Sequence, residues 1–144
     1  MVEKWIIPCN IKHFDLISYF KENSCVVWKN SFSIKKGDIA YIYIGSPIRQ
    51  IKYRCKVVSD VVSDEILQKN QYAISEEKNN NYFSKKVKYI ILELEREYQD
   101  GILRYEDLKL NGLGQVQIQA RTDRRLQRYI DGVETKVAEG ETNE

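Results

Sequence analysis

Short runs of apolar residues, bounded by turn residues, predict several β-strands along the chain. The clearest is residues 39–44, Ile-Ala-Tyr-Ile-Tyr-Ile, whose β-branched and aromatic side chains favour a strand over a helix. Residues 51–57 alternate strictly between apolar and basic side chains, which is typical of a half-buried antiparallel strand. Residues 5–9 and 87–94 complete the predicted strands, and a short apolar run at 26–28 breaks into a polar loop.

Apolar residues recur at helical spacing in residues 14–23, which predicts a helix of about three turns. Residues 105–109 form a second predicted helix that ends at an Asn-Gly pair, and residues 123–130 form the last one. The polar residues 63–86 predict a loop that contains a short helix near 64–70. A strand, a helix, several strands and then late helices indicate an α+β domain with a small mixed or barrel-like sheet.

The composition fits one folded domain followed by a polar tail. A chain of 144 residues that is 42% hydrophobic can bury a core, and we place its single domain at residues 1–132. Residues 133–144 are rich in Glu, Thr and Gly, which predicts a disordered acidic tail. The sequence shows neither a secretory signal nor the roughly 20 apolar residues of a membrane span, so we expect a cytoplasmic protein with no membrane partner. Cys9, Cys25 and Cys55 have no metal-ligand spacing and fit reduced thiols that fill the core.

The sequence offers little that would support an enzyme. His13 is the only histidine, and a solvent-exposed or capping position suits the start of a predicted helix better than a catalytic triad. Zinc-ligand spacing and phosphate-binding glycine loops are absent from the sequence. Numerous carboxylates leave an acid–base pair open, but we predict no catalytic residue, no metal and no cofactor.

Aromatic residues are more informative, because the chain has two tryptophans and ten tyrosines. Trp5 lies inside a predicted strand, where core packing is the simplest interpretation. Trp28 lies where an apolar run gives way to polar Lys29 and Ser31, and an indole there can form a wall on which a flat base stacks. Such a contact is worth about 1–3 kcal/mol. Core packing of Trp28 is the alternative interpretation.

Basic side chains form two groups. A solvated outer face is the simplest interpretation of the first group, which shares the polar side of a predicted strand. The second group could meet a phosphate backbone if its segment is helical, with a solvated helix face as the equal alternative. The net charge of +2 permits phosphate contacts without requiring them. The first group is Lys52, Arg54 and Lys56, and the second is Arg121, Arg124, Arg125 and Arg128.

Taken in order, these segments resemble the EVE domain, a branch of the PUA-like superfamily that also contains YTH and SRA domains. The most specific part is the series Gly-Asp-x-x-Tyr-Ile-Tyr, Pro and Ile-Lys-Tyr within residues 37–53. The resemblance covers about residues 4–131 and implies a small, strongly curved PUA-like β-barrel flanked by helices. Its other pieces are residues 5–10, 14–15, 28, 108–113 and 119–121.

The resemblance also implies a function, because relatives in this superfamily hold a modified base, flipped or unpaired, in an aromatic cage. Stacking and edge hydrogen bonds then offset the cost of flipping. In this chain Trp28 would be the cage wall, Cys9 and Asn10 its polar edge, and residues 43–47 the opposite lip. Arg121 matches the family's late basic position. The residues predicted to form the base-binding pocket are Cys9, Asn10, Trp28, Lys29, Ser31, Tyr43, Gly45, Ser46 and Pro47, and those predicted to meet the nucleic-acid backbone are Arg121, Arg124 and Arg125.

These expectations leave several functional hypotheses open. The first is a non-catalytic reader of modified cytosine or adenine in DNA, acting with a separate nuclease or other effector protein. The second is an RNA-binding module that recognises a base in tRNA or rRNA, which the 2′-hydroxyl group would distinguish from a DNA reader. The third is a small-molecule or protein-interaction domain. A hydrolase that uses carboxylates of the cleft is the least favoured hypothesis.

Overall fold

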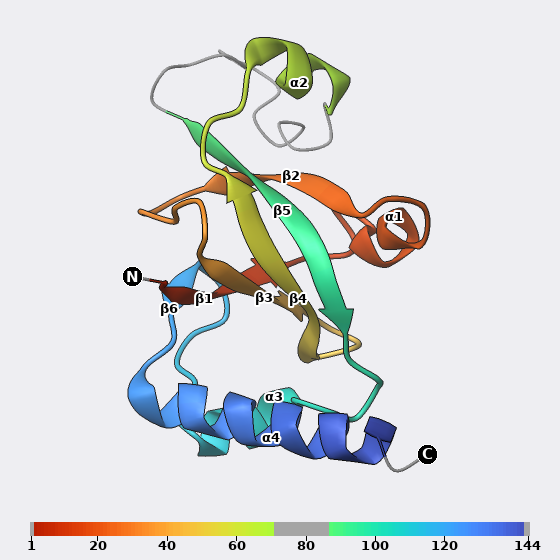
Figure 1. The fold of residues 1–144 in the computed structure, drawn as a ribbon, viewed down its shortest axis with the longest axis vertical. Coiled ribbons are helices and arrows are strands. Elements are labelled where there is room, and N and C mark those ends of the chain that lie inside the picture. The colour runs from red at the N-terminus through yellow and green to blue at the C-terminus, as the bar shows by residue number, and fades with distance from the viewer. Residues whose placement is uncertain (1, 71–86, 143–144) are drawn as a thin grey trace.

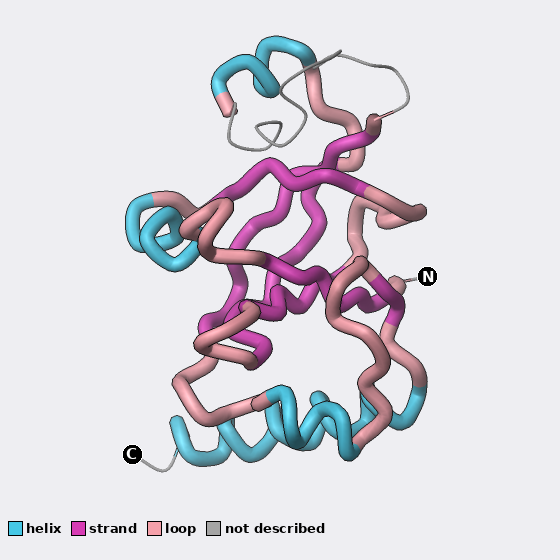
Figure 2. The backbone as a smooth tube through the Cα atoms, turned by 180° about the vertical axis from the view of Figure 1, so that it is seen from behind, coloured by secondary structure: helices cyan, strands magenta, loops and turns pink. Residues whose placement is uncertain are grey.

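The computed structural model describes residues 2–70 and 87–142, which form one curled sheet flanked by helices (Figure 1). The sheet has six strands in the order β2-β5-β4-β3-β1-β6. Helices α3 and α4 lie together at one end of the sheet and α2 at the opposite end, in both views of the backbone (Figures 1 and 2). The strands are β1 (Lys4–Cys9), β2 (Cys25–Asn30), β3 (Ile39–Ile44), β4 (Gln50–Ser59), β5 (Lys88–Glu97) and β6 (Ala120–Arg121), and the helices are α1 (Leu16–Glu22), α2 (Asp64–Lys69), α3 (Tyr105–Leu110) and α4 (Arg124–Thr142).

The strand pairing confirms the predicted α+β class and the small, mixed, curved sheet. β1 pairs in parallel with β3, whereas the other paired strands run antiparallel. The register shifts between Ile42 and Tyr43 in β3, and again along β4. Such irregularities bend a strand and increase its twist, so they help the sheet to curl into a half-barrel.

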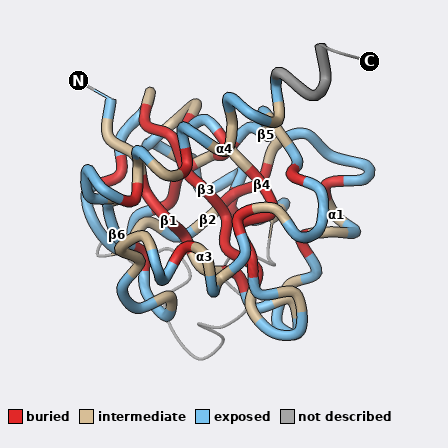
Figure 3. Tube along the Cα trace, turned by 90° about the horizontal axis from the view of Figure 1, so that it is seen from below, coloured by how far each residue is buried: buried red, intermediate tan, exposed pale blue. Residues whose placement is uncertain are grey.

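The central strand β3 explains why the sequence shows its strongest strand signal at residues 39–44. All six residues of β3 are buried. Ala40, Ile42 and Ile44 pack into the core that α1 covers, whereas Tyr41 and Tyr43 pack into the core beneath α3 and α4. A strand covered on both faces reads as a continuous apolar run, because neither face meets water. Buried positions accordingly follow the central strands (Figure 3).

The C-terminal residues differ from the prediction. We expected a helix at 123–130 and a disordered tail over 133–144, but α4 continues to Thr142. Glu134 accepts hydrogen bonds from Arg54 Nη1 at 2.8 Å and from the Tyr98 hydroxyl at 2.8 Å, and its side chain is only 12% exposed. Burial, reinforced by Glu134, raises the pKa of Tyr98, so this phenol remains a donor. These contacts extend the helix beyond the predicted end.

The short helix and the cysteines agree with the sequence predictions, whereas one basic residue does not. The short helix expected near 64–70 is α2, while residues 71–86 of the predicted loop lie outside the described residues. Cys9 and Cys55 are buried and all three cysteines are free thiols, as expected. Lys52 corrects the prediction of a solvated basic face, because it is buried and its Nζ lies 3.0 Å from Asp100 Oδ1. Within residues 2–70 and 87–142, every helix is too short or too polar to span a membrane.

Candidate functional site

A pocket of about 460 Å³ lies beside Trp28, where the end of β1, the end of β2 and the segment before β6 meet. The structure brings together five of the residues that the sequence predicted for a base-binding pocket: Cys9, Asn10, Trp28, Lys29 and Ser31. Their role in binding a base stays a prediction. The sequence reasoning missed the other residues that line this pocket, which are Pro8, His13, Phe14, Val27, Phe32, Gln117, Ile118 and Gln119.

The Trp28 pocket owes its aromatic wall to the turn between β1 and α1. The Asn10 carbonyl accepts hydrogen bonds from the backbone N–H groups of His13 and Phe14, and Asn10 Oδ1 accepts one from Lys12. This turn places the Phe14 ring 6.1 Å from the Trp28 ring at an interplanar angle of 60°. An edge-to-face pair of this kind fixes the orientation of the indole. Trp28 is only partly buried, so it supplies a rigid apolar surface to the pocket.

Gln119 closes the pocket from the segment that precedes β6. Its Nε2 donates to the Lys29 carbonyl at 2.7 Å, and its Oε1 accepts from the Ser31 N–H at 2.9 Å. Both amide atoms thus hold the backbone where β2 ends, and Gln119 is only 7% exposed. Gln119 is 90 positions from Lys29 along the chain, so periodicity within a short window could not reveal this contact. The only signal was that residues 119–121, Gln-Ala-Arg, belong to the resemblance.

The structure corrects the prediction that Tyr43, Gly45, Ser46 and Pro47 form the opposite lip of the pocket. Tyr43 is 4% exposed and packs edge-on against Tyr105 at 6.1 Å, in the core beneath α3 and α4. Side chains alternate across a strand, so Tyr43 faces away from its neighbours Ile42 and Ile44. The Gly45 N–H donates to the Cys9 carbonyl at 3.1 Å and so joins the ends of β3 and β1. Ser46 and Pro47 form an exposed turn with a cis peptide bond, and neither of them lines the Trp28 pocket.

The predicted arginine cluster is divided between two elements. Arg121 lies in β6, where its guanidinium carbon is 5.3 Å from the centre of the Trp5 ring. Arg124 and Arg125 begin α4, and Arg125 Nη2 donates to the Leu110 carbonyl at 2.6 Å. The four arginines therefore do not share one helix face, and Arg121 alone lies close to the pockets.

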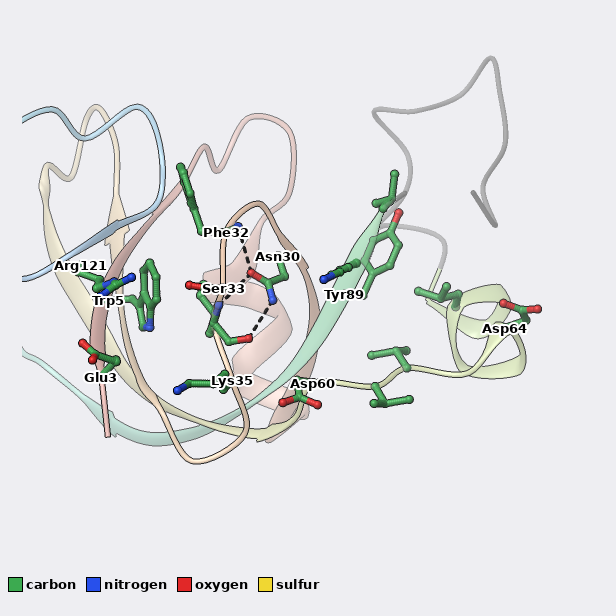
Figure 4. Close-up of a pocket in the computed structure, with 16 residues that line it drawn as sticks. Glu3, Trp5, Asn30, Phe32, Ser33, Lys35, Asp60, Asp64, Tyr89 and Arg121 are labelled. Carbon is green, nitrogen blue, oxygen red and sulfur yellow. Dashed lines mark hydrogen bonds between the residues drawn. The ribbon is translucent and has the colours of Figure 1, made fainter. Parts of the chain in front are cut away.

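A second pocket, of about 640 Å³, lies on the other side of the loop that follows β2 (Figure 4). Trp5 and Phe32 stack in it with ring centres 6.5 Å apart and planes 20° from parallel. Trp5 Nε1 donates to Asp38 Oδ2 at 3.0 Å, and Trp5 is 3% exposed, which confirms its predicted position in the core. Phe32 lines this pocket and the Trp28 pocket alike.

The Cys9 thiol at the edge of the Trp28 pocket is buried and hydrogen-bonded. Burial raises the pKa of the Cys9 thiol to about 12, so it is protonated at neutral pH. Its sulfur lies 3.7 Å from the Phe14 carbonyl, to which it donates. Among the described residues, no group of His, Cys, Asp and Glu side chains is arranged to hold a metal ion.

Comparison with known proteins identifies the fold. No family model and no curated protein matches the chain. Among solved structures, a substituted form of the ASCH protein from Zymomonas mobilis is 12% identical, covers 91% of this chain and 96% of its own, and gives a TM-score of 0.63. A hypothetical protein from Leishmania major is 14% identical, with coverages of 94% and 97% and a TM-score of 0.62. A Pseudomonas syringae protein is 13% identical, with coverages of 90% and 98% and a TM-score of 0.58.

ASCH domains are PUA-like half-barrels, so this likeness agrees with the PUA-like fold that the sequence predicted. At these identities the comparison shows the fold alone. Membership of the PUA-like superfamily and of the EVE family stays a prediction.

Proposed function

We propose that this protein is an RNA-binding module that holds one unpaired base in the Trp28 pocket. The observation that carries the proposal is the construction of the pocket: an indole held edge-on by Phe14, with polar groups of Asn10, Ser31 and Gln117 along its border. Base recognition requires a flat apolar wall for stacking and hydrogen-bonding groups for the base edge. The PUA-like fold and the resemblance to base-binding domains support the same proposal.

An unpaired base suits this surface better than a duplex. The net charge is only +2, so phosphate contacts supply little of the affinity, and stacking must supply more. A base that is already unpaired avoids the few kcal/mol that extraction from a duplex costs. Sequence-specific RNA recognition mostly uses such unpaired bases, in loops, bulges and ends. These considerations favour single-stranded RNA over duplex DNA as the ligand.

We further propose that a methylated adenine or cytosine is the preferred base. Phe32 and Ile118, both exposed, add apolar surface to the pocket that holds the indole. A methyl group on the base edge would bury apolar area against these side chains, worth about 0.8 kcal/mol for each carbon. The unmodified base would leave that surface in contact with water.

The test is a fluorescence-anisotropy titration with labelled single strands of equal sequence. Each strand carries one central adenine or cytosine, with or without methylation, in RNA and in DNA. Trp28→Ala is expected to weaken RNA binding about 5- to 150-fold, which corresponds to the loss of one stacking contact. Trp28→Phe retains a ring and should keep most of the affinity. Leu110→Ala serves as the control, because Leu110 is 72% exposed and lies in α3, away from the pocket.

The outcomes separate the hypotheses. RNA binding that depends on Trp28 supports the proposal, and a further gain on methylation supports the preferred base. Equal affinity for DNA and RNA would show that the 2′-hydroxyl is not recognised and would remove the preference for RNA. Binding that Trp28→Ala leaves unchanged would refute the Trp28 pocket as the site.

A further inference from the structure

We infer that the second pocket takes the next base of the same strand, so that the site holds two adjacent bases with Phe32 between them. This inference rests on the proposed function of the Trp28 pocket. It adds a second base-binding site whose residues, apart from Arg121, were assigned to ligand binding neither by the sequence patterns nor by the resemblance.

The two pockets share their dividing walls. Phe32 lines both of them and is 47% exposed, so its ring stands at the surface between them. The loop that carries it contributes Ser31 to the Trp28 pocket and Ser33 to the second pocket. The segment at β6 likewise contributes Gln119 to the first and Arg121 to the second. One phosphate joins neighbouring nucleotides, so adjacent bases lie close together. Two pockets that share a wall are close enough to hold such a pair of bases.

The second pocket offers a supported aromatic surface, as the first does. Phe32 stacks on Trp5, which Asp38 holds in place through the indole N–H. Asn30 fixes the loop itself, because its Oδ1 accepts from the Phe32 N–H at 3.2 Å and its Nδ2 donates to the Ile34 carbonyl at 2.9 Å (Figure 4). A preorganised ring loses little conformational entropy when a base stacks on it. The volume of about 640 Å³ lies within the usual range of small-molecule pockets.

The charges around the second pocket indicate which part of a nucleotide enters it. Three carboxylates line it, and three basic side chains balance their charge, so the pocket as a whole does not attract a phosphate; the carboxylates are those of Glu3, Asp60 and Asp64, and the basic side chains are Lys35, Lys88 and Arg121. Carboxylate oxygens do accept hydrogen bonds from the amino group of a base such as cytosine. Arg121 lies at the border against Trp5, is exposed, and forms no ion pair with the described part of the chain, so it can meet the linking phosphate. The aromatic surface and the carboxylate acceptors therefore suit the base, which enters the pocket, and the phosphate stays at the rim beside Arg121.

Two strands of equal length test the inference by anisotropy. One strand is RNA with abasic sugars at every position except one, and the other carries two adjacent bases, the second being cytosine. The wild-type protein should bind the two-base strand at least about fivefold more tightly, since each stacked base adds about 1–3 kcal/mol. Replacing the second cytosine by uracil, which has no amino group, should remove part of this gain.

Two variants locate the gain in the second pocket. Phe32→Ala should abolish it by removing the dividing ring. Val61→Trp should abolish it by filling the second pocket, while the affinity for the one-base strand stays unchanged. Val61 lines only the second pocket and is 78% exposed, so the larger side chain should not disturb folding, which circular dichroism checks. Leu110→Ala should keep the full gain.

The failures of the two proposals can be told apart. If the one-base strand binds in a Trp28-dependent way but the second base adds less than about twofold, the second pocket is refuted and the proposed function stands. A gain that survives both Phe32→Ala and Val61→Trp also refutes it. If neither strand binds the wild-type protein, the proposed function itself fails and the inference fails with it.

Discussion

Replacing Gln119 tests whether the wall of the Trp28 pocket is built as the structure shows. Gln119→Ala removes two hydrogen bonds, of 2.7 Å to the Lys29 carbonyl and 2.9 Å from the Ser31 N–H. A hydrogen bond contributes about 0.5–1.5 kcal/mol net, so losing two costs about 1–3 kcal/mol. Ser31 is exposed and water can replace part of the loss, which places the expected decrease in unfolding free energy near 2 kcal/mol. For a chain of this length such a decrease lowers the Tm by about 4–8 °C.

Gln117→Ala is the matched control. Gln117 lies in the same segment and lines the same pocket, but it is exposed and forms no hydrogen bond with the described residues. Urea unfolding followed by far-ultraviolet circular dichroism gives the free energies of both variants. Because Gln119 also positions the pocket wall, its variant should lose RNA affinity at temperatures where it is fully folded. Equal stability of the two variants would refute the reasoning, since it would mean that the two hydrogen bonds contribute nothing.

Three further predictions concern helix α4 and the cysteines. Glu134→Ala should destabilise the protein by about 2 kcal/mol, because Arg54 then keeps only Glu95 as an ion-pair partner and the Tyr98 hydroxyl loses its acceptor. Lys136→Ala, exposed on the same helix, is the control, and equal urea midpoints of the two variants would contradict the role of Glu134 in holding α4. Burial raises the pKa of Cys9 from 9.0 to about 12, so the folded state holds this proton more tightly than the unfolded chain. That contribution to stability is complete below pH 9.0 and is lost as the pH rises towards about 12, which urea midpoints across this range should show. At neutral pH iodoacetamide should modify the partly exposed Cys25 well before Cys9, as mass spectrometry of the native protein can measure, and the reverse order would contradict the burial of Cys9.

Local patterns predicted most of the sheet, because burial leaves a direct trace in the sequence. Residues 39–44 form a strand that is covered on both faces, and their unbroken apolar run indicated this. The basic face at 51–57 was misinterpreted, since alternation shows which side chains share a face but not what covers that face. Lys52 and Arg54 lie opposite carboxylates at positions 100 and 134, which no short window includes.

The candidate site was predicted where it depends on single elements and missed where it depends on contacts between distant segments. Asn10 directly follows β1 and Trp28 lies two residues before the end of β2, so their meeting could be expected from a PUA-like order of elements. Gln119 lies 90 positions along the chain from Lys29, to which it is hydrogen-bonded, and Phe32 lines two pockets from one loop. The error at Tyr43 was avoidable, because strict alternation through Ile42 and Ile44 already assigns Tyr43 to the other face.

The most direct test of the central claim uses the two indole N–H signals of the protein. The chain has only two tryptophans, so a ¹⁵N-labelled sample should show two such NMR signals, which the Trp28→Phe variant assigns. Titration with the one-base RNA strand should shift the Trp28 signal strongly, while the signal of Trp5, whose N–H donates to Asp38, moves little. A Trp28 signal that stays in place while the strand binds would show that the base lies elsewhere, and the account of this pocket would be wrong.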